Sequence, residues 1–453
     1  MATLSSSGYN ALIMAEIFKV KGLAGKKTLN GVIEVSGAKN AVLQALAFSV
    51  LFKDELTIKN VPAIEDVKRM TTLLADLGAD VVPKKSGSYS IKFSKGIRSE
   101  ISEEISKKLR ASIVLTGPIL ARTGEVSFPH PGGCVIGARP IDLFVDGFTK
   151  LGAKVDFKDG KYHMKAKDGK LHGAEIFMKN QSVTGTQTLM LAAVLAKGKT
   201  IIKNAALEPE TKHLADFLNK CGAKIKGAGT STIEVTGTGL LSAKGKSYIT
   251  PPDRIEAGSF LILGALAGNN LEIKNCDPSW VEALTENLIS AGVKMQIGKS
   301  SIKFSGSGKI PNSDFKGLNI KTHEYPGFPT DVQAPMVVFL TQATGESFVF
   351  ETIFEGRLNY AEDLRRMGAD IKVWDPHRAT VKGPTPLRGR EVESPDIRAG
   401  LAFLLAAILA EGDSVIHNVY YIDRGYGNIE ERLRRIGVDI KRECLEVCAP
   451  CVN

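Results

Sequence analysis

Residues 131–140, with the sequence PGGCVIGARP, place a thiol and a permanent cation on one short glycine-rich segment. Gly132 and Gly133 allow backbone conformations that other residues avoid, so we expect Cys134 to lie on a loop. Arg139 can donate paired hydrogen bonds to a carboxylate or phosphate, and a nearby cation favours the reactive thiolate. The segment predicts an acid or nucleophile beside an anion-binding group, with a free cysteine in a surface turn as the alternative.

Polar or charged residues also open six strongly apolar segments of the chain. Helix N-termini attract anions through their free N–H groups and the helix dipole, and a charge there is costly to bury unless it is paired. Ser182 and Asp331 could simply be helix caps, whereas cations oppose the dipole and therefore favour a binding role. The residues at these entrances are Lys39 with Asn40, Arg110, Ser182 to Thr184, Arg254, Asp331 and Arg398.

A second set of arginines falls in loops that connect strands to helices: Arg139, Arg357 and Arg424. Within the segment IDRGYGN, we expect Asp423 to orient the guanidinium of Arg424. Together with the helix entrances, these arginines predict a receptor for small anions.

The elements that carry these residues repeat six times. Each repeat contains a helix end, a glycine turn and a strand start, as in LLADLGADVV and LRRIGVDIKR. Glycine after a last helical turn is the expected left-handed cap, and the β-branched residues beyond it favour a strand. The turn glycines are Gly78, Gly152, Gly222, Gly292, Gly368 and Gly437, at spacings of 74, 70, 70, 76 and 69 residues.

Each repeat also contains a helix that is apolar nearly all round, which predicts burial, whereas helices such as 64–77 and 429–436 are amphipathic and should lie outside. No glycine-rich phosphate fingerprint follows a first strand, which argues against a doubly wound dinucleotide fold. Six units of two strands and two helices, with apolar helices inside, predict an inside-out α/β barrel.

Composition sets broad limits on the class of protein. The 453 residues suffice for two or three domains, and the net charge is +10, with dispersed rather than clustered basic residues. We therefore expect no nucleic-acid partner. The most apolar segment, 399–410, is too short to cross a membrane, so we expect a cytoplasmic protein without a membrane anchor.

The six cysteines do not have the spacing of a disulfide framework. Cys221 and Cys276 follow predicted secondary structure and are expected to be buried. Cys444, Cys448 and Cys451 crowd the C-terminus, where we favour a frayed tail over a metal site, because zinc normally requires a fourth ligand.

Seven short motifs in order, from about Phe18 to Arg442, resemble the UDP-N-acetylglucosamine 1-carboxyvinyltransferases, which are enolpyruvyl transferases of the EPSP synthase-like superfamily. Besides the PGGC loop they are GAKN (37–40), LRAS (109–112), DRIEAG (253–258), FPTD (328–331), FEGR (354–357) and IDRGY (422–426). The resemblance implies two three-repeat domains joined by a double crossover, with the substrate site between them. The resemblance thus divides the chain into a strand at 18–36 that completes the C-terminal domain and domains at 37–248 and 249–442. From their composition, residues 1–17 are expected to form a disordered extension and residues 443–453 a cysteine-rich tail.

The resemblance also implies roles for individual residues. Cys134 would be the acid and the target of fosfomycin, Asp331 the base, and Lys39 a catalytic cation. Phosphoenolpyruvate would contact Lys39, Asn40, Arg139 and Arg424. Arg254, Arg357 and Arg398 would be secondary members of the cleft. The UDP-sugar would contact Arg110, Arg139, Pro140, Ile141, Asp142, Leu143, Asn180, Gln181, Ser182, Val183, Asp331 and Ile353.

The implied reaction transfers enolpyruvyl from phosphoenolpyruvate to the 3-hydroxyl of UDP-N-acetylglucosamine, the first committed step of peptidoglycan synthesis, with no metal or cofactor, in a monomer. Two alternatives remain. One is the sister reaction on shikimate 3-phosphate, which does not use a PGGC loop of this kind. The other is a non-catalytic repeat scaffold that binds polyanions, which would spread cations and aromatics over an exposed face.

Overall fold

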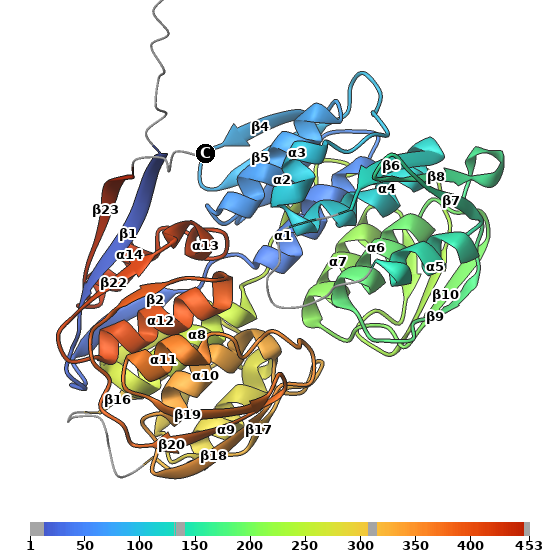
Figure 1. Ribbon diagram of the computed structural model, residues 1–453. Coiled ribbons are helices and arrows are strands. Elements are labelled where there is room, and N and C mark those ends of the chain that lie inside the picture. The colour runs from blue at the N-terminus through green and yellow to red at the C-terminus, as the bar shows by residue number, and fades with distance from the viewer. Residues whose placement is uncertain (1–12, 131, 133–140, 307–314, 448–453) are drawn as a thin grey trace, which may run out of the picture.

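The computed structural model describes residues 13–130, 132, 141–306 and 315–447. The helices that the sequence predicts to be buried lie at the centre of two lobes (Figure 1). In α12, every residue from Arg398 to Leu409 is buried, and in α8 every residue from Ile255 to Ala267. The buried helices are α1 (Lys39–Phe48), α4 (Thr116–Thr123), α6 (Val183–Ala193), α8 (Arg254–Ala267), α10 (Gln333–Leu340) and α12 (Ile397–Leu409).

Amphipathic helices cover the outside, as their sequence pattern predicts. In α2, for example, Val67, Met70, Leu73 and Leu74 face the core. The outer helices are α2 (Glu65–Asp76), α5 (Asp142–Lys150), α7 (Pro209–Lys220), α9 (Glu282–Ser290), α11 (Ala361–Arg366) and α14 (Ile429–Arg435). Short helices α3 (Glu103–Lys108) and α13 (Val419–Asp423) lie in connections, and 3-10 turns Arg110–Leu115 and Thr330–Val332 lead into α4 and α10.

The six predicted glycine turns all have the left-handed backbone that the pattern requires. Their φ angles lie between 89° and 108°. Each turn releases the chain from an outer helix into a strand, which confirms the six-unit reading of the sequence.

The described strands form six sheets, one for each unit. In the N-terminal half the orders are β13-β3-β5-β4 (Ser247–Ile249, Leu56–Lys59, Ser88–Lys92, Asp80–Lys84), β6-β8-β7 (Glu125–Pro129, Lys161–Ala166, Ala153–Lys158) and β11-β12-β10-β9 (Lys224–Lys226, Thr232–Thr236, Lys199–Lys203, Glu175–Phe177). In the C-terminal half they are β15-β16-β14-β2 (Met295–Ile297, Ser301–Ser305, Gly268–Lys274, Leu29–Glu34), β17-β18-β20-β19 (Ile320–Lys321, Gly345–Phe350, Arg378–Gly383, Asp370–Asp375) and β21-β22-β1-β23 (Glu391–Glu393, Asp413–His417, Ile13–Lys21, Asp439–Val447). Central helices with sheets around them are the predicted inside-out α/β barrel.

Three strands join sheets far from their place in the sequence. Strand β2 pairs in parallel with β14, with Ile33 opposite Ile273, and β13 pairs in parallel with β3, with Tyr248 opposite Ile58. Strand β1 lies between β22 and β23. In Figure 1 the dark blue β1 and β2 accordingly lie among the elements of the C-terminal half.

Both predicted ends of the chain need correction. Residues 13–17 belong to β1 rather than to an extension, and residues 443–447 belong to β23 rather than to a tail, so Cys444 lies in a strand and is exposed. The reason is that β1 and β23 pair along nine residues, from Ile13 opposite Val447 to Lys21 opposite Asp439. Cys448 and Cys451 lie outside the described residues.

Two separate hydrophobic cores fill the two halves. One holds buried residues between Val42 and Tyr248, and the other holds residues 18–35 together with residues 255–440. The chain passes from one core to the other between Val35 and Val42, and again between Tyr248 and Ile255. That the halves act as two domains with these boundaries stays a prediction.

Two further observations concern the expected class of protein. Across the described ranges, no helix is long and apolar enough to cross a membrane. Within the same ranges, no group of three or more His, Cys, Asp or Glu side chains is arranged to hold a metal ion.

Cys221 and Cys276 are buried as predicted, and burial raises the pKa of Cys276 to about 11.

Candidate active site

A cavity of about 1250 Å³ lies between the two halves and collects the helix entrances of both. Its wall includes residues from α1, α6, α8 and α12. Of the residues that the sequence predicts, those lining it are Lys39, Asn40, Arg110, Asp142, Leu143, Asn180, Gln181, Ser182, Val183, Arg254, Asp331, Ile353, Arg357, Arg398 and Arg424. Six separate helix starts thus contribute to one cavity.

Four predicted residues do not appear in this wall. Ile141 is buried in the core of the N-terminal half. Cys134, Arg139 and Pro140 lie outside the described residues, so their places in the site stay predictions.

The caps of the central helices explain how cations can stand at their starts. Ser182 accepts a hydrogen bond from the backbone N–H of Gly185 at 3.1 Å, as a cap should. Asp253 and Asp396, which directly precede α8 and its counterpart α12, accept N–H bonds from their first turns. An acidic cap therefore offsets the dipole just before Arg254 and Arg398.

The first charged cluster consists of Lys39, Asp66 and Arg424. Asp66 Oδ2 lies 2.7 Å from Lys39 Nζ, and Asp66 Oδ1 lies 2.9 Å from Arg424 Nε. Lys39 and Asp66 belong to the N-terminal half and Arg424 to the C-terminal half. One carboxylate therefore links two cations, and through them the two halves.

Burial and charge compete within this cluster. Burial lowers the pKa of Lys39, against the opposing attraction of Asp66, and repulsion by Arg424 and Arg398 acts in the same direction as burial. Burial acts to raise the pKa of Asp66, but Lys39 and Arg424 more than offset it, so this carboxyl stays below its usual range. Asp66 therefore holds a firm negative charge, and it is the group that favours the charged form of Lys39.

The second charged cluster consists of Asp331, Arg357 and Arg398. Asp331 Oδ1 accepts from Arg357 Nη2 at 2.8 Å, and Asp331 Oδ2 accepts from Arg398 Nη2 at 3.1 Å. Arg398 Nη1 donates to the hydroxyl of Tyr426 at 2.8 Å. Asp331 is thus an ion-pair partner of two arginines, and it lies within the 3-10 turn Thr330–Val332 rather than at the position before it.

A third group, at the junction of the halves, pairs Arg254 with two acids of the N-terminal half. Arg254 Nε lies 3.1 Å from Glu210 Oε1. Glu208, which precedes α7, lines the cavity, and burial raises the pKa of its carboxyl against the attraction of Arg254. Oε2 of Glu208 has no hydrogen-bond partner among the described atoms.

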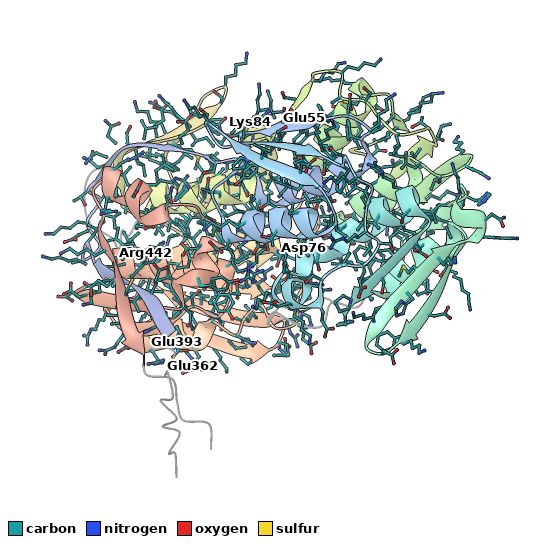
Figure 2. The ribbon with its side chains drawn as sticks, turned by 90° about the horizontal axis from the view of Figure 1, so that it is seen from above. Glu55, Asp76, Lys84, Glu362, Glu393 and Arg442 are labelled. Atoms are coloured by element: carbon teal, nitrogen blue, oxygen red, sulfur yellow. The ribbon has the colours of Figure 1, made fainter. Side chains whose placement is uncertain are left out.

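Sequence reasoning missed Asp66, Glu208 and Glu210, and it misplaced Asp423. Both oxygens of Asp423 accept from Arg442 at 2.8 Å, and it is Asp66 that contacts Arg424. Arg442, labelled in Figure 2, comes from β23. It also donates a hydrogen bond to Glu430. A signal for Asp66 was present, since it occupies the apolar stripe of α2 with Met70, Leu73 and Leu74, where an unpaired charge would be costly.

Comparisons with known proteins agree with this architecture. The family model described as EPSP synthase (3-phosphoshikimate 1-carboxyvinyltransferase) matches residues 23–433. The solved structure of the enolpyruvyl transferase NikO from Streptomyces tendae covers 96% of the chain and all of its own, with a TM-score of 0.82 and 21% identity. EPSP synthase from Acinetobacter baumannii covers 94% of the chain and all of its own, with a TM-score of 0.70 and 18% identity. These structural matches confirm the fold.

Curated relatives match more closely in sequence. A UDP-N-acetylglucosamine 1-carboxyvinyltransferase of Koribacter versatilis (strain Ellin345) is 44% identical, covering 93% of the chain and 95% of the relative. UDP-N-acetylglucosamine 1-carboxyvinyltransferase 1 of Caldanaerobacter subterraneus subsp. tengcongensis is 43% identical, covering 92% and 97%. The chain therefore belongs to the EPSP synthase family, and within it to the UDP-N-acetylglucosamine 1-carboxyvinyltransferases.

Proposed function

We propose that this enzyme transfers the enolpyruvyl group of phosphoenolpyruvate to the 3-hydroxyl of UDP-N-acetylglucosamine and releases phosphate. The observation that carries the proposal is the cavity between the halves, where four cations at helix starts and two arginines from loops converge around two carboxylates. Both proposed substrates are small anions, and such a cavity suits them electrostatically.

The phosphate of phosphoenolpyruvate is assigned to Lys39 and Arg424, with Asn40 nearby and Arg139 joining from the loop. These groups stabilise the negative charge that grows on the leaving phosphate. The UDP-sugar is assigned to Arg110, the start of α5 and residues 180–183, with Ile353 and Asp331 toward the sugar. Arg139 to Leu143 would complete this surface.

The reaction needs a base and an acid at the two ends of one double bond. Asp331 takes the proton of the 3-hydroxyl as that oxygen bonds to C2, and the π electrons of the double bond take a proton at C3 from the thiol of Cys134. In the second step the C2–O bond to phosphate breaks, the thiolate left on Cys134 takes a proton from C3, and the double bond forms again. The proton held by Asp331 passes to the released phosphate or to solvent. Neither step requires an oxidant, and we propose that neither requires a metal or organic cofactor.

The arrangement of the charged clusters supports a monomeric enzyme, because one chain supplies both carboxylates and their four cations. We place it in the cytoplasm and propose neither a nucleic-acid nor a membrane partner. Light scattering after size exclusion would test the oligomeric state.

The decisive assay measures phosphate release from phosphoenolpyruvate with each of two acceptors. Release with UDP-N-acetylglucosamine and none with shikimate 3-phosphate is the expected result. Release with shikimate 3-phosphate alone would assign the sister reaction. Absence of release with either acceptor, from a folded protein that binds polyanions, would favour the non-catalytic scaffold.

A further inference from the structure

Asp331, the proposed base, is engaged by arginines in the described structure. Both of its oxygens are paired, to Arg357 and to Arg398, and its side chain is 26% exposed. Arg254 also attracts it from the junction of the halves. A carboxylate held in this way is a weak acceptor for the proton of a sugar hydroxyl, because the two guanidinium groups stabilise its negative charge and disfavour its protonation.

The two arginines that pair with Asp331 are not equivalent. Arg357 is 3% exposed, and its guanidinium lies 5.0 Å from the ring of Phe354. Arg398 contacts two different residues: its Nη1 donates to the hydroxyl of Tyr426, and its Nη2 donates to Asp331 Oδ2. Arg398 can therefore exchange its second partner while Tyr426 keeps the guanidinium in place.

Arg398 lines the same cavity as Lys39 and Arg424, the proposed phosphoenolpyruvate site, and its charge acts on Lys39 in the same direction as burial and Arg424, lowering the pKa of that amine. An anion that binds at Lys39 and Arg424 therefore comes within the electrostatic reach of Arg398. Such an anion competes with Asp331 for the same guanidinium.

We propose that Asp331 is an internal counter-ion of the anion site, and that phosphoenolpyruvate displaces it from Arg398, freeing Oδ2 to act as the base. This inference rests on the proposed function and adds an order to it: the anionic substrate activates the base. Arg357 keeps Oδ1 and holds the carboxylate in position. Arg398 is on this account a positioning residue for Asp331 as well as part of the anion site.

The test is the affinity of Asp331→Asn for phosphoenolpyruvate without the UDP-sugar, measured by calorimetry, with inorganic phosphate as a probe that cannot form an adduct. Because one partly exposed ion pair no longer competes, both anions should bind roughly fivefold more tightly than to wild type. A loss of affinity, or none of the expected gain, would overturn the proposal. Asp331→Ala carries the same expectation and replaces the amide variant if that variant does not fold.

Glu208→Gln is the matched control, because it removes a carboxyl from the same cavity without touching Arg357 or Arg398. An equal gain in anion affinity in Glu208→Gln would mean that any loss of a carboxyl from the cavity favours anions through the overall electrostatic field. That result would also overturn the proposal. In an Arg398→Gln background the gain from Asp331→Asn should vanish, since the competition runs through Arg398. If wild type turns over both substrates and the gain is absent, this inference alone fails; if wild type binds neither substrate, the proposed function fails.

Discussion

Replacing Asp66 by asparagine tests whether this buried carboxylate maintains the charge of the anion site. The side chain is 2% exposed and contacts Lys39 at 2.7 Å and Arg424 at 2.9 Å. Removing one partner of a buried ion pair typically costs about 3–5 kcal/mol. Lys39 can shed its proton and relieve part of that cost, so we expect a loss of about 2–4 kcal/mol in the free energy of unfolding.

The same substitution should reduce the use of phosphoenolpyruvate. Burial already lowers the pKa of Lys39, and Asp66 is its principal opposing influence. In Asp66→Asn, Lys39 becomes more neutral and Arg424 loses its orientation, so kcat/KM for phosphoenolpyruvate should fall by roughly 30- to 100-fold. The alkaline limb of that pH profile should move to lower pH.

Urea unfolding and phosphate release provide the measurements, and Asp76→Asn provides the control. Asp76 is exposed at the far end of the same helix (Figure 2), so its change should be nearly neutral. Because the folded pKa of Asp66 lies below its unfolded value, its stabilisation is present above about pH 4 and disappears as the pH falls through the folded pKa. Wild-type-like activity and stability of Asp66→Asn would refute this reasoning.

Three further predictions concern the loop, a turn and the cysteines. Fosfomycin should alkylate Cys134, faster with the UDP-sugar bound, and peptide mapping that finds the adduct on another cysteine would contradict the assignment. Gly437→Ala should lower the free energy of unfolding in urea by about 1–2 kcal/mol, because Gly437 has a φ of 103°. An added Cβ would meet no atom within 4 Å at Gly437 or at Gly239, so Gly239→Ala is the matched control and should be nearly neutral. At pH 8, iodoacetamide should modify exposed Cys444 in the native protein and leave Cys276, whose pKa is about 11, unmodified; modification of Cys276 would contradict its burial.

The repeats were predictable because each depends on local chemistry. A glycine at the end of each outer helix needs a positive φ, and an all-round apolar helix needs burial on every side. These two signals repeat at nearly constant spacing, so they give the number of units and the inside-out arrangement. Because each repeat has one apolar helix, the six repeats also predict six helix starts with polar or charged residues, and the structure brings these starts to one cavity.

Pairings between distant parts of the chain were beyond the sequence pattern. The strand Ile13–Lys21 exists because Asp439–Val447 lies beside it, and neither end alone carries that information. Asp423 precedes Arg424 in sequence, yet its carboxylate contacts Arg442 from the last strand. Asp66 reaches Arg424 across 358 positions of the chain. In each case a partner far along the chain decides where the side chain lies.

Asp66 and Asp331 each contact two cations in the cavity. Because the cations differ in kind, we expect removal of the two carboxylates to have opposite effects on anion binding. Asp331 neutralises two arginines, which stay charged without it, so removing it leaves the cations available and anion binding should improve. Asp66 supports a buried lysine, whose amine can become neutral, so removing it takes a cation away and anion binding should weaken. Comparing phosphoenolpyruvate affinity in Asp331→Asn and Asp66→Asn therefore separates an acid that competes with the substrate from an acid that maintains its site. Changes in the same direction would mean that the total charge of the cavity, rather than these two pairings, governs anion binding.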